Sequence, residues 1–319
     1  MIFEKNYSII IIENENRNGV VYMFIERINY NKVITIKLVI PGGCNAKCPF
    51  CYNKDKKMTC NKAQFLENFI PSLDNLLNEI EDKNEVSVDI TGGEPTLDYE
   101  FLIQVLTKLR EYNIKSRVLR TTMTTNGVNL DKVIPYLEGV IDYINISIHS
   151  HKCEERYEIT GMKFTEYDYF KLIQKLKAVG IDTSASAVIY KDIPNFNSWR
   201  DDFIFWARTN GFKAIRFRCD VFWKDSEIFD NYLLSAKYDN RFDIITYENT
   251  TDSHWLRLRD KETGFRVFFL HGVLDTSLLT KGIEYVIDDD GKCYCDYYKR
   301  TPIDKYEYEI GKIYDKMES

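Results

Sequence analysis

The sequence lacks the long apolar run and the leader that would carry a chain into or across a membrane. A short apolar run at residues 9–12 is followed at once by acidic residues and by no small-residue cleavage site, so we predict no signal peptide. No apolar run approaches the roughly 18 residues that a membrane-spanning helix requires. We therefore expect a cytoplasmic protein that does not bind a membrane.

An excess of basic residues is also missing. Lys and Arg number 43 against 49 Asp and Glu, which gives a net charge of −6. This balance argues against a general nucleic-acid-binding surface, although it allows a local basic pocket. With 44% hydrophobic and 29% charged residues, the composition is that of a globular protein. The 319 residues suffice for one large α/β domain with an appendage or for two ordinary domains.

The eight cysteines show no two separated pairs at zinc-finger spacing. Instead Cys44, Cys48 and Cys51 form a C-x3-C-x2-C group directly after an apolar run at residues 33–40. Thiolates select zinc, copper(I) or iron–sulfur clusters. A structural zinc ion takes four ligands, and so does a [4Fe–4S] cluster as a rule. Three thiols would leave one iron open, which indicates a reactive cluster, while zinc binding and C-x2-C thiol redox chemistry remain alternatives.

Strand-like and helix-like patterns alternate along the middle of the chain. Strand patterns occur at residues 33–40, 86–90, 118–125, 141–148, 183–190 and 213–221, and helical patterns lie between them at 63–80, 98–112, 130–137, 167–179 and 197–209. Regular βα alternation predicts parallel strands with right-handed crossovers. A doubly wound sheet and a partial barrel both satisfy this pattern.

The ends of the chain have different patterns. Two β-like runs at residues 7–12 and 20–28 flank an Asn-Gly turn signal, which predicts an N-terminal β-hairpin. After residue 221 aromatic residues are scattered among charged ones, with β-like segments at 264–270 and 282–295. We therefore expect a hairpin over residues 1–32, a core over 33–221 and an α+β C-terminal extension over 222–319, with the extension capping the core.

Polar and thiol-bearing residues follow several of the predicted strands. They are the cysteine group, Gly92-Gly93-Glu94-Pro95, Asn126, His149 and Cys219. Ligands of parallel α/β folds gather at the carboxyl ends of the strands. The positions therefore predict one shared site.

Two of these motifs together resemble the radical S-adenosylmethionine (radical SAM) superfamily, with a MoaA-like or PqqE-like core. They are C-x3-C-x2-C with Phe50 before its last cysteine, and the GGEP stretch after the next strand. The resemblance covers roughly residues 33–221 and implies a partial (β/α)6 TIM-like barrel. It also implies that Cys44, Cys48 and Cys51 hold a [4Fe–4S] cluster whose open iron binds S-adenosylmethionine. Reductive cleavage would then give a 5′-deoxyadenosyl radical that abstracts hydrogen from a substrate.

The resemblance suggests further cofactor contacts, each with a plainer alternative. Phe50 is expected against adenine, Gly92, Gly93 and Glu94 near the methionine ammonium group, and Asn126 near the ribose or carboxylate. Ser147, His149 and Ser184 are expected to face the barrel interior and the cofactor. The alternatives are an ordinary turn for the glycine pair and for Asn126-Gly127, loop packing for Phe50, a satisfied buried histidine, and barrel-filling serines.

Arg216 and Arg218 alternate with apolar residues on the last predicted strand, so both point the same way. If they point inward they form a carboxylate or phosphate clamp for substrate or cofactor; if outward, a solvated face. Cys219, Cys293 and Cys295 are candidates for an auxiliary cluster, although the seven-cysteine extension of many peptide-modifying relatives is missing.

These features predict a radical SAM enzyme that acts on a small molecule or short peptide and receives electrons from a donor such as flavodoxin or ferredoxin. Two other functions remain open. One is a non-catalytic iron–sulfur sensor or electron-transfer protein, and the other is a zinc-binding module.

Overall fold

The computed structural model describes residues 7–13, 20–26, 33–51, 53, 61–80, 85–249, 253–272 and 284–294. Its helices are α1 (Lys62–Glu79), α2 (Tyr99–Glu111), α3 (Leu130–Val133), α4 (Cys153–Thr160), α5 (Glu166–Ala178), α6 (Phe196–Thr209) and α7 (Glu227–Lys237), with short 3-10 turns at Ile114–Ser116 and Ile134–Tyr136. Its strands are β1 (Tyr7–Glu13), β2 (Val20–Glu26), β3 (Val33–Ile40), β4 (Glu85–Gly92), β5 (Arg120–Thr125), β6 (Tyr143–Ser147), β7 (Asp182–Ile189), β8 (Ala214–Cys219), β9 (Phe242–Asn249), β10 (Ser253–Asp260), β11 (Arg266–Gly272), β12 (Glu284–Ile287) and β13 (Cys293–Tyr294).

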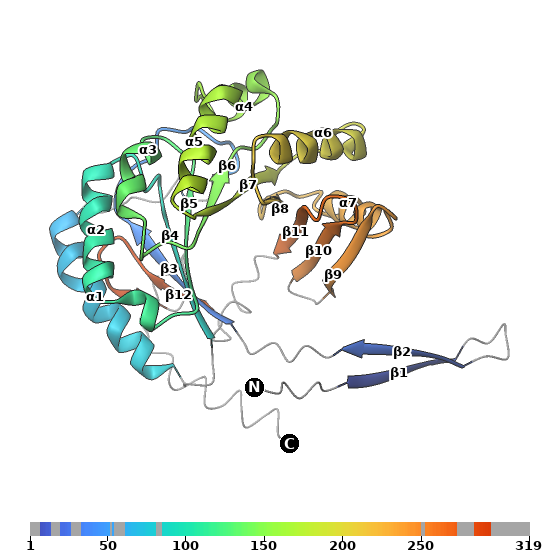
Figure 1. Ribbon diagram of the computed structural model, residues 1–319, viewed down its shortest axis with the longest axis horizontal. Helices are drawn as coiled ribbons and strands as arrows, with labels where there is room; N and C mark the ends of the chain where they lie inside the picture. Colours follow the sequence, from blue (N-terminus) through green and yellow to red (C-terminus); the bar gives the residue numbers. More distant parts are fainter. Residues whose placement is uncertain are drawn as a thin grey trace.

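Strands β3 to β8 form the parallel centre of an eleven-stranded sheet, each beside the next in chain order. The predicted βα alternation is therefore confirmed. In Figure 1 the sheet curves, and α1, α2, α3 and α5 lie along its outer side. In this arrangement the carboxyl ends of all six strands lie at the same end of the sheet.

The two faces of this sheet differ in chemistry because side chains alternate along a strand. In β3, Ile34, Ile36 and Leu38 are buried in the core shared with the helices, whereas Thr35 and Lys37 point to the other side. The neighbouring strands repeat the pattern in register. We call the side away from the helices the inner face. It carries Thr35, Lys37, Ser87, Asp89, Arg120, Thr122, Thr124, Tyr143, Asn145, Ser147, Ser184, Ser186, Arg216 and Arg218.

The C-terminal extension continues the sheet at both of its edges. Strand β12 pairs parallel with β3, and β11 pairs parallel with β8 before β10 and β9 follow antiparallel. The described part of the extension adds strands beside the core, and the expected cap over the core stays a prediction. The proposed boundary at residue 221 stays a prediction.

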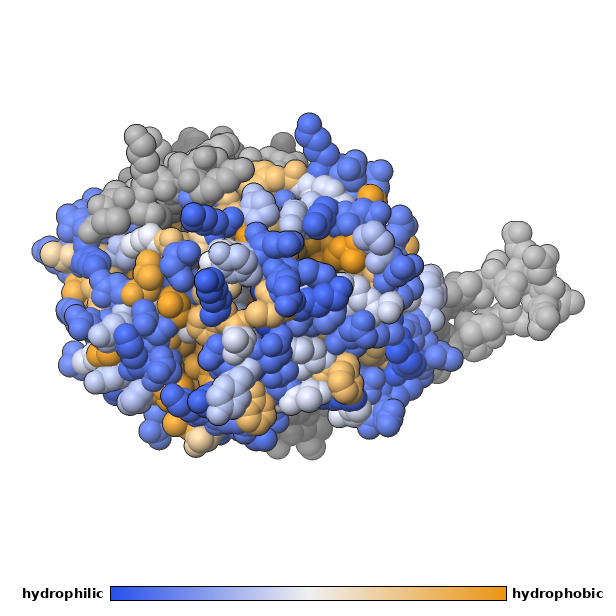
Figure 2. Space-filling model, turned by 90° about the horizontal axis from the view of Figure 1, so that it is seen from above, coloured by the Kyte–Doolittle hydropathy of each residue, from blue (hydrophilic) through white to orange (hydrophobic). Residues whose placement is uncertain are grey.

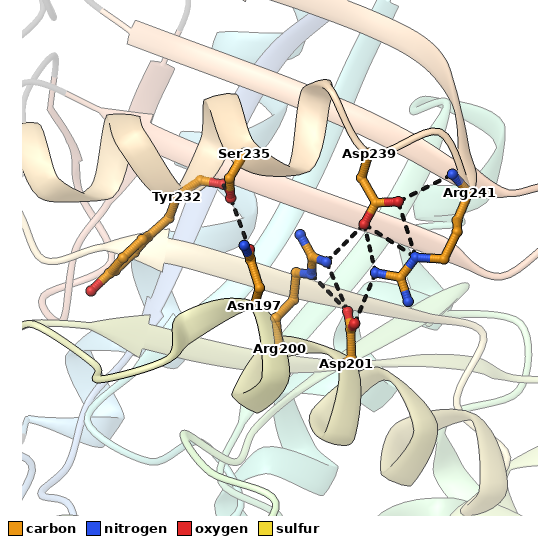
Figure 3. A network of polar contacts seen from close by, with 7 residues as sticks. All are labelled: Asn197, Arg200, Asp201, Tyr232, Ser235, Asp239 and Arg241. Atoms are coloured by element: carbon orange, nitrogen blue, oxygen red, sulfur yellow. Dashed lines mark hydrogen bonds and ion pairs between the residues drawn. The ribbon is translucent and has the colours of Figure 1, made fainter.

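A network of charged side chains fastens the extension to α6 (Figure 3). Arg200 is about 1% exposed and pairs with Asp201 at 2.8 Å and Asp239 at 2.9 Å. Arg241 contacts the same two carboxylates. A buried guanidinium needs such anions, so this network joins α6 to the segment between α7 and β9.

The predicted N-terminal hairpin forms as a separate sheet in which β1 and β2 pair antiparallel. Among the helices that the structure describes, none is both long and apolar enough to span a membrane. The face seen in Figure 2 is mainly hydrophilic, with apolar residues in small groups.

Candidate active site

The cysteine group lies on the loop that leaves the carboxyl end of β3. The backbone N–H of Lys47 donates to the Thr160 carbonyl at the end of α4, at 2.9 Å. Within the loop, the N–H of Cys51 donates to the Cys48 carbonyl at 3.1 Å, and that of Ala46 contacts Cys44 Sγ at 3.4 Å. These contacts hold the three free thiols on one short turn.

The electrostatics of the loop disfavour three thiolates unless a cation binds there. Burial raises the pKa of Cys44. It also raises the pKa of Cys48 to about 12, with the charges of Cys44 and Cys51 acting in the same direction. A bound metal group reverses this effect because it stabilises each thiolate. The donor set therefore fits a soft, cationic metal group such as an iron–sulfur cluster.

The two glycines of GGEP allow the ends of β3 and β4 to touch. A Cβ on Gly92, whose φ is +153°, would lie 2.5 Å from the Ile40 carbonyl oxygen. A Cβ on Gly93 would lie 2.4 Å from the carbonyl oxygen of Gly43. The Gly92 carbonyl accepts a hydrogen bond from Asn53 Nδ2 at 3.1 Å. The glycines thus have a structural role in seating the cysteine loop, and their expected contact with the cofactor stays a prediction.

Glu94 links the ends of β4 and β5 through its buried carboxylate. It accepts hydrogen bonds from the backbone N–H of Thr96 at 3.0 Å and of Asn126 at 2.6 Å, and from the hydroxyls of Thr96 and Thr125. Burial raises the pKa of this carboxyl, and the four hydrogen bonds oppose the shift. All four donors are groups of this chain. The described contacts of Glu94 therefore hold the ends of β4 and β5 together.

Asn126 forms the expected turn and also contacts the cysteine loop, while its contact with the cofactor stays a prediction. Its Oδ1 accepts from the Val128 N–H at 3.0 Å, which is the expected turn. Its Nδ2 donates to Asn45 Oδ1 at 2.9 Å and lies 3.9 Å from Cys44 Sγ. The side chain therefore couples the end of β5 to the cysteine loop.

Phe50 lies in an aromatic group with His149 and Tyr190, at centroid distances of 4.7 and 4.9 Å. His149 is buried and has a positive φ of 67°. Its Nδ1 accepts from the Val188 N–H at 3.3 Å, which puts the proton of the neutral ring on Nε2. Burial lowers the pKa of His149 to about 4, so the imidazole is uncharged at neutral pH.

The inner face of the sheet is polar and carries the remaining predicted residues. Ser147 is half-buried, and Ser184 donates to Asn145 Oδ1 at 2.7 Å. The strand register places Arg216 beside Ser186 on this face, and Arg218 follows two residues later. Both arginines therefore point inward, which decides the alternative that the sequence left open.

Arg216 stands out among these residues because its guanidinium lacks a full set of partners. It lies over the rings of Tyr143 and Phe268, at 5.6 and 5.5 Å. Its Nε is buried without a hydrogen-bond partner among the described residues. Burial lowers its pKa, the nearby Arg218 charge acts in the same direction, and Asp89 opposes the shift.

The structure does not bring the proposed auxiliary-cluster cysteines together. Cys219 ends β8 and points into the helix-side core, whereas Cys293 lies on β13 at the far edge of the sheet. Cys295 lies outside the described residues. No group of three metal-binding side chains in the described part of the chain includes Cys219 or Cys293.

Several inner-face residues were missed by the sequence reasoning. Lys37, Asp89, Arg120 and Tyr143 line the face that Arg216 enters. The available signal was a charged residue inside an apolar strand, as at Lys37 in VITIKLVI. When helices cover one face of a strand, a charged residue inside that strand must point to the opposite face.

Comparisons with known proteins agree with this geometry. The family model described as Radical SAM superfamily matches residues 38–197. A GTP 3′,8-cyclase from Vibrio atlanticus is 28% identical over 182 residues, which cover 54% of this chain and 52% of the relative. A GTP 3′,8-cyclase from Mannheimia succiniciproducens is 26% identical over 272 residues, which cover 82% of this chain and 72% of the relative.

Among solved structures, Streptococcus suis SuiB aligns with a TM-score of 0.53 at 13% identity, covering 88% of this chain and 65% of SuiB. That likeness is one of fold, and it confirms the predicted partial barrel. The chain spans about half the length of the first of these relatives.

Proposed function

The chain belongs to the radical SAM superfamily and is a radical SAM enzyme, and we propose that its substrate is an anionic small molecule or short peptide bound on the inner face of the sheet. The observation that carries this proposal is the inward-pointing, incompletely paired Arg216, with Arg218 and Arg120 beside it. Guanidinium groups bind carboxylates and phosphates with paired hydrogen bonds.

Radical SAM enzymes use a [4Fe–4S] cluster and S-adenosylmethionine, and we assign the cluster to Cys44, Cys48 and Cys51. When bound, these cofactors supply a 5′-deoxyadenosyl radical that removes a hydrogen atom from the substrate. Asn126 and the GGEP turn hold the loop that presents the thiols. We further assign contacts with S-adenosylmethionine to Phe50, Gly93 and the residues at the ends of β6 and β7, which border the loop.

The inner face suits a polar substrate because it has little apolar packing: among the described residues its apolar cluster is the small contact of Val39 with Val286. Its side chains are mostly hydroxyls, an amide and charged groups, so a bound anion would replace water rather than displace a core. The charge of the face is mixed, since Asp89 and the Lys37–Glu284 ion pair lie among the arginines. A substrate with one anionic end and a neutral or cationic remainder fits this pattern.

Two substrate types are the first to test. The curated relatives are named GTP 3′,8-cyclases, which makes GTP a natural candidate for the phosphate-bearing class. Short peptides with a free carboxylate represent the other class. For electrons we propose a flavodoxin or ferredoxin donor, and a cytoplasmic location where thiols stay reduced.

The test is formation of 5′-deoxyadenosine by anaerobically reconstituted enzyme with dithionite and S-adenosylmethionine. Anionic compounds from the two classes should stimulate it, and Arg216→Gln should raise the KM of the active compound about 10-fold or more, as expected for a lost charge-assisted hydrogen bond. The basal, substrate-free reaction should be unchanged. Arg208→Gln on the exposed side of α6 is the matched control.

Other outcomes would support the alternatives. An iron–sulfur cluster without any 5′-deoxyadenosine would favour a sensor or electron-transfer protein. Zinc in place of iron on Cys44, Cys48 and Cys51 would favour a zinc-binding module. Stimulation only by neutral compounds, or equal KM values in Arg216→Gln and Arg208→Gln, would overturn the proposed anionic substrate.

A further inference from the structure

Three side chains that the radical chemistry does not use meet on the helix side of the extension. They are Asp230 on α7, His254 on β10 and His271 on β11. Asp230 Oδ1 lies 2.8 Å from Nδ1 of His254 and 2.7 Å from Nδ1 of His271. One ligand atom from each residue lies within 4.8 Å of the others. In Figure 1, α7 lies against β9, β10 and β11 at one end of the sheet.

The sheet register explains why the two histidines face the same way. His254 and His271 are directly paired across the antiparallel β10–β11 ladder, so their side chains leave the same face of the sheet. His271 is about 8% exposed, and the other two residues are half-buried. Helix α7 closes this face with Asp230, next to the buried Phe229.

Cys219 lies on β8, the strand beside that of His271. Arg218 pairs with Leu270 across the parallel β8–β11 ladder, so the next residues on the two strands are Cys219 and His271. Both point to the helix side, because Phe217 and Phe269 two residues earlier are buried there. The negative charge of Asp230 reaches the Cys219 thiol and, after burial and Asp220, contributes to a raised pKa of about 12.

We propose that Asp230, His254 and His271 bind a divalent transition-metal ion of the zinc class, and that the Cys219 thiol, which lies outside this group in the metal-free structure, moves in as the fourth ligand. Carboxylate oxygen, imidazole nitrogen and thiolate sulfur are the ligands of tetrahedral zinc sites. The set comes from β8, β10, β11 and α7, so it joins the core strand β8 to the extension. With four protein ligands and no open position, the ion would be structural.

Ligand chemistry separates this site from the cysteine loop. A set with two imidazoles and one carboxylate suits a single zinc or iron(II) ion, whereas three thiols favour a cluster. The hydrogen bonds seen between Asp230 and the two imidazoles use the same Nδ1 atoms that would bind the ion. Metal binding therefore requires each neutral ring to carry its proton on Nε2 instead. The inference does not depend on the proposed substrate.

The test uses the full chain with Cys44, Cys48 and Cys51 all changed to alanine, so that only the second site can bind. Zn²⁺ should bind at about one ion per chain and raise the melting temperature. Adding His254→Gln or His271→Gln should weaken Zn²⁺ binding about 100-fold or more, since changes to groups that merely support ligands already cost 10–100-fold. Glutamine can still donate a hydrogen bond to Asp230, which keeps the metal-free fold comparable. His151→Gln is the matched control.

Cobalt(II) reports the ligand set directly. A tetrahedral site should give intense visible bands with a sulfur-to-cobalt charge-transfer band, and Cys219→Ser should abolish that band. An unchanged spectrum in Cys219→Ser would remove Cys219 from the site. No Zn²⁺ binding in the background without Cys44, Cys48 and Cys51, or equal binding in His271→Gln and His151→Gln, would show that the three side chains are only a hydrogen-bonded group. Failure of the proposed substrate would leave each of these readouts in place.

Discussion

Changing Gly93 to alanine should damage the junction on which the cysteine loop rests. The new Cβ would lie 2.4 Å from the Gly43 carbonyl oxygen and 2.7 Å from its carbon. Both are backbone atoms, so relief requires the β3 and β4 ends to separate by about half an ångström or more. Overpacking of this kind costs about 1–3 kcal/mol. The separation also strains the 2.9 Å hydrogen bond from the Glu94 N–H to that carbonyl, which adds about 1 kcal/mol.

Gly43→Ala is the matched control because it lies in the same junction. A Cβ there meets nothing within 4 Å, and its φ is not in the left-handed region. Restricting the unfolded chain should make it neutral or stabilising by about 0.4–1 kcal/mol. Urea unfolding of the metal-free protein, followed by Trp fluorescence, should therefore place Gly93→Ala about 2–4 kcal/mol below wild type and Gly43→Ala at or above it.

Iron content after anaerobic reconstitution gives a second readout of the same junction. Gly93→Ala should bind less iron, since Gly43 directly precedes Cys44. Equal stability of the two variants, or a Gly93→Ala protein as stable as wild type, would refute the idea that backbone contact explains the glycine pair.

Three further predictions concern single side chains. Arg241, with Arg200, holds the pKa of Asp239 at about 2, below its unfolded value. The ionised Asp239 carboxylate therefore stabilises the fold fully above about pH 4, and this stabilisation is lost as the pH falls to 2. Asp239→Asn should lower the free energy of unfolding in urea by about 2 kcal/mol at pH 7 and by almost nothing at pH 2. The pKa of His149 is lowered to about 4. The stability that the neutral His149 ring contributes is therefore complete above about pH 6.5 and is lost as the pH falls through 4. His149→Gln should remove that part of the acid dependence, and a proton titration of the ring by NMR checks it. Asn126→Asp should reduce iron uptake more than Asn126→Ala, because it adds a negative charge beside Cys44.

The core of the fold could be predicted from sequence because its signals are local. Most of the strands from β3 to β8 are short runs rich in apolar residues, although β5 has the sequence RTTMTT. Helices α2 and α5 carry buried stripes at helical spacing, such as Leu102, Val105 and Leu109. Helices α4 and α7 were missed. In α4 only Arg156 and Thr160 are buried, so its sequence carries almost no apolar stripe. In α7 the scattered aromatic residues concealed the stripe of Phe229 and Leu233.

Some parts of the candidate site could also be predicted from sequence, and others could not. The cysteine loop and the GGEP turn are continuous in sequence and were identified directly. The inner face and the Asp230–His254–His271 group depend on which strand lies beside which, and β11 and β12 reach their neighbours from far along the chain. The orientation of Arg216 was undecidable for the same reason, because alternation along one strand fixes a shared side but not which side faces the helices.

The polar inner face also explains where the stability of this fold resides. A closed eight-stranded barrel fills its interior with branched apolar side chains. Here the buried apolar residues lie between the sheet and the helices, while the inner face has only the small contact of Val39 with Val286 as an apolar cluster in the described residues. Substitutions on the inner face should therefore alter ligand binding more than folding. Substitutions such as Phe217→Ala on the helix side should cost about 3–5 kcal/mol. The two faces are thus separable by mutation, which is what a protein needs if its substrate pocket is to vary while its cofactor loop stays fixed.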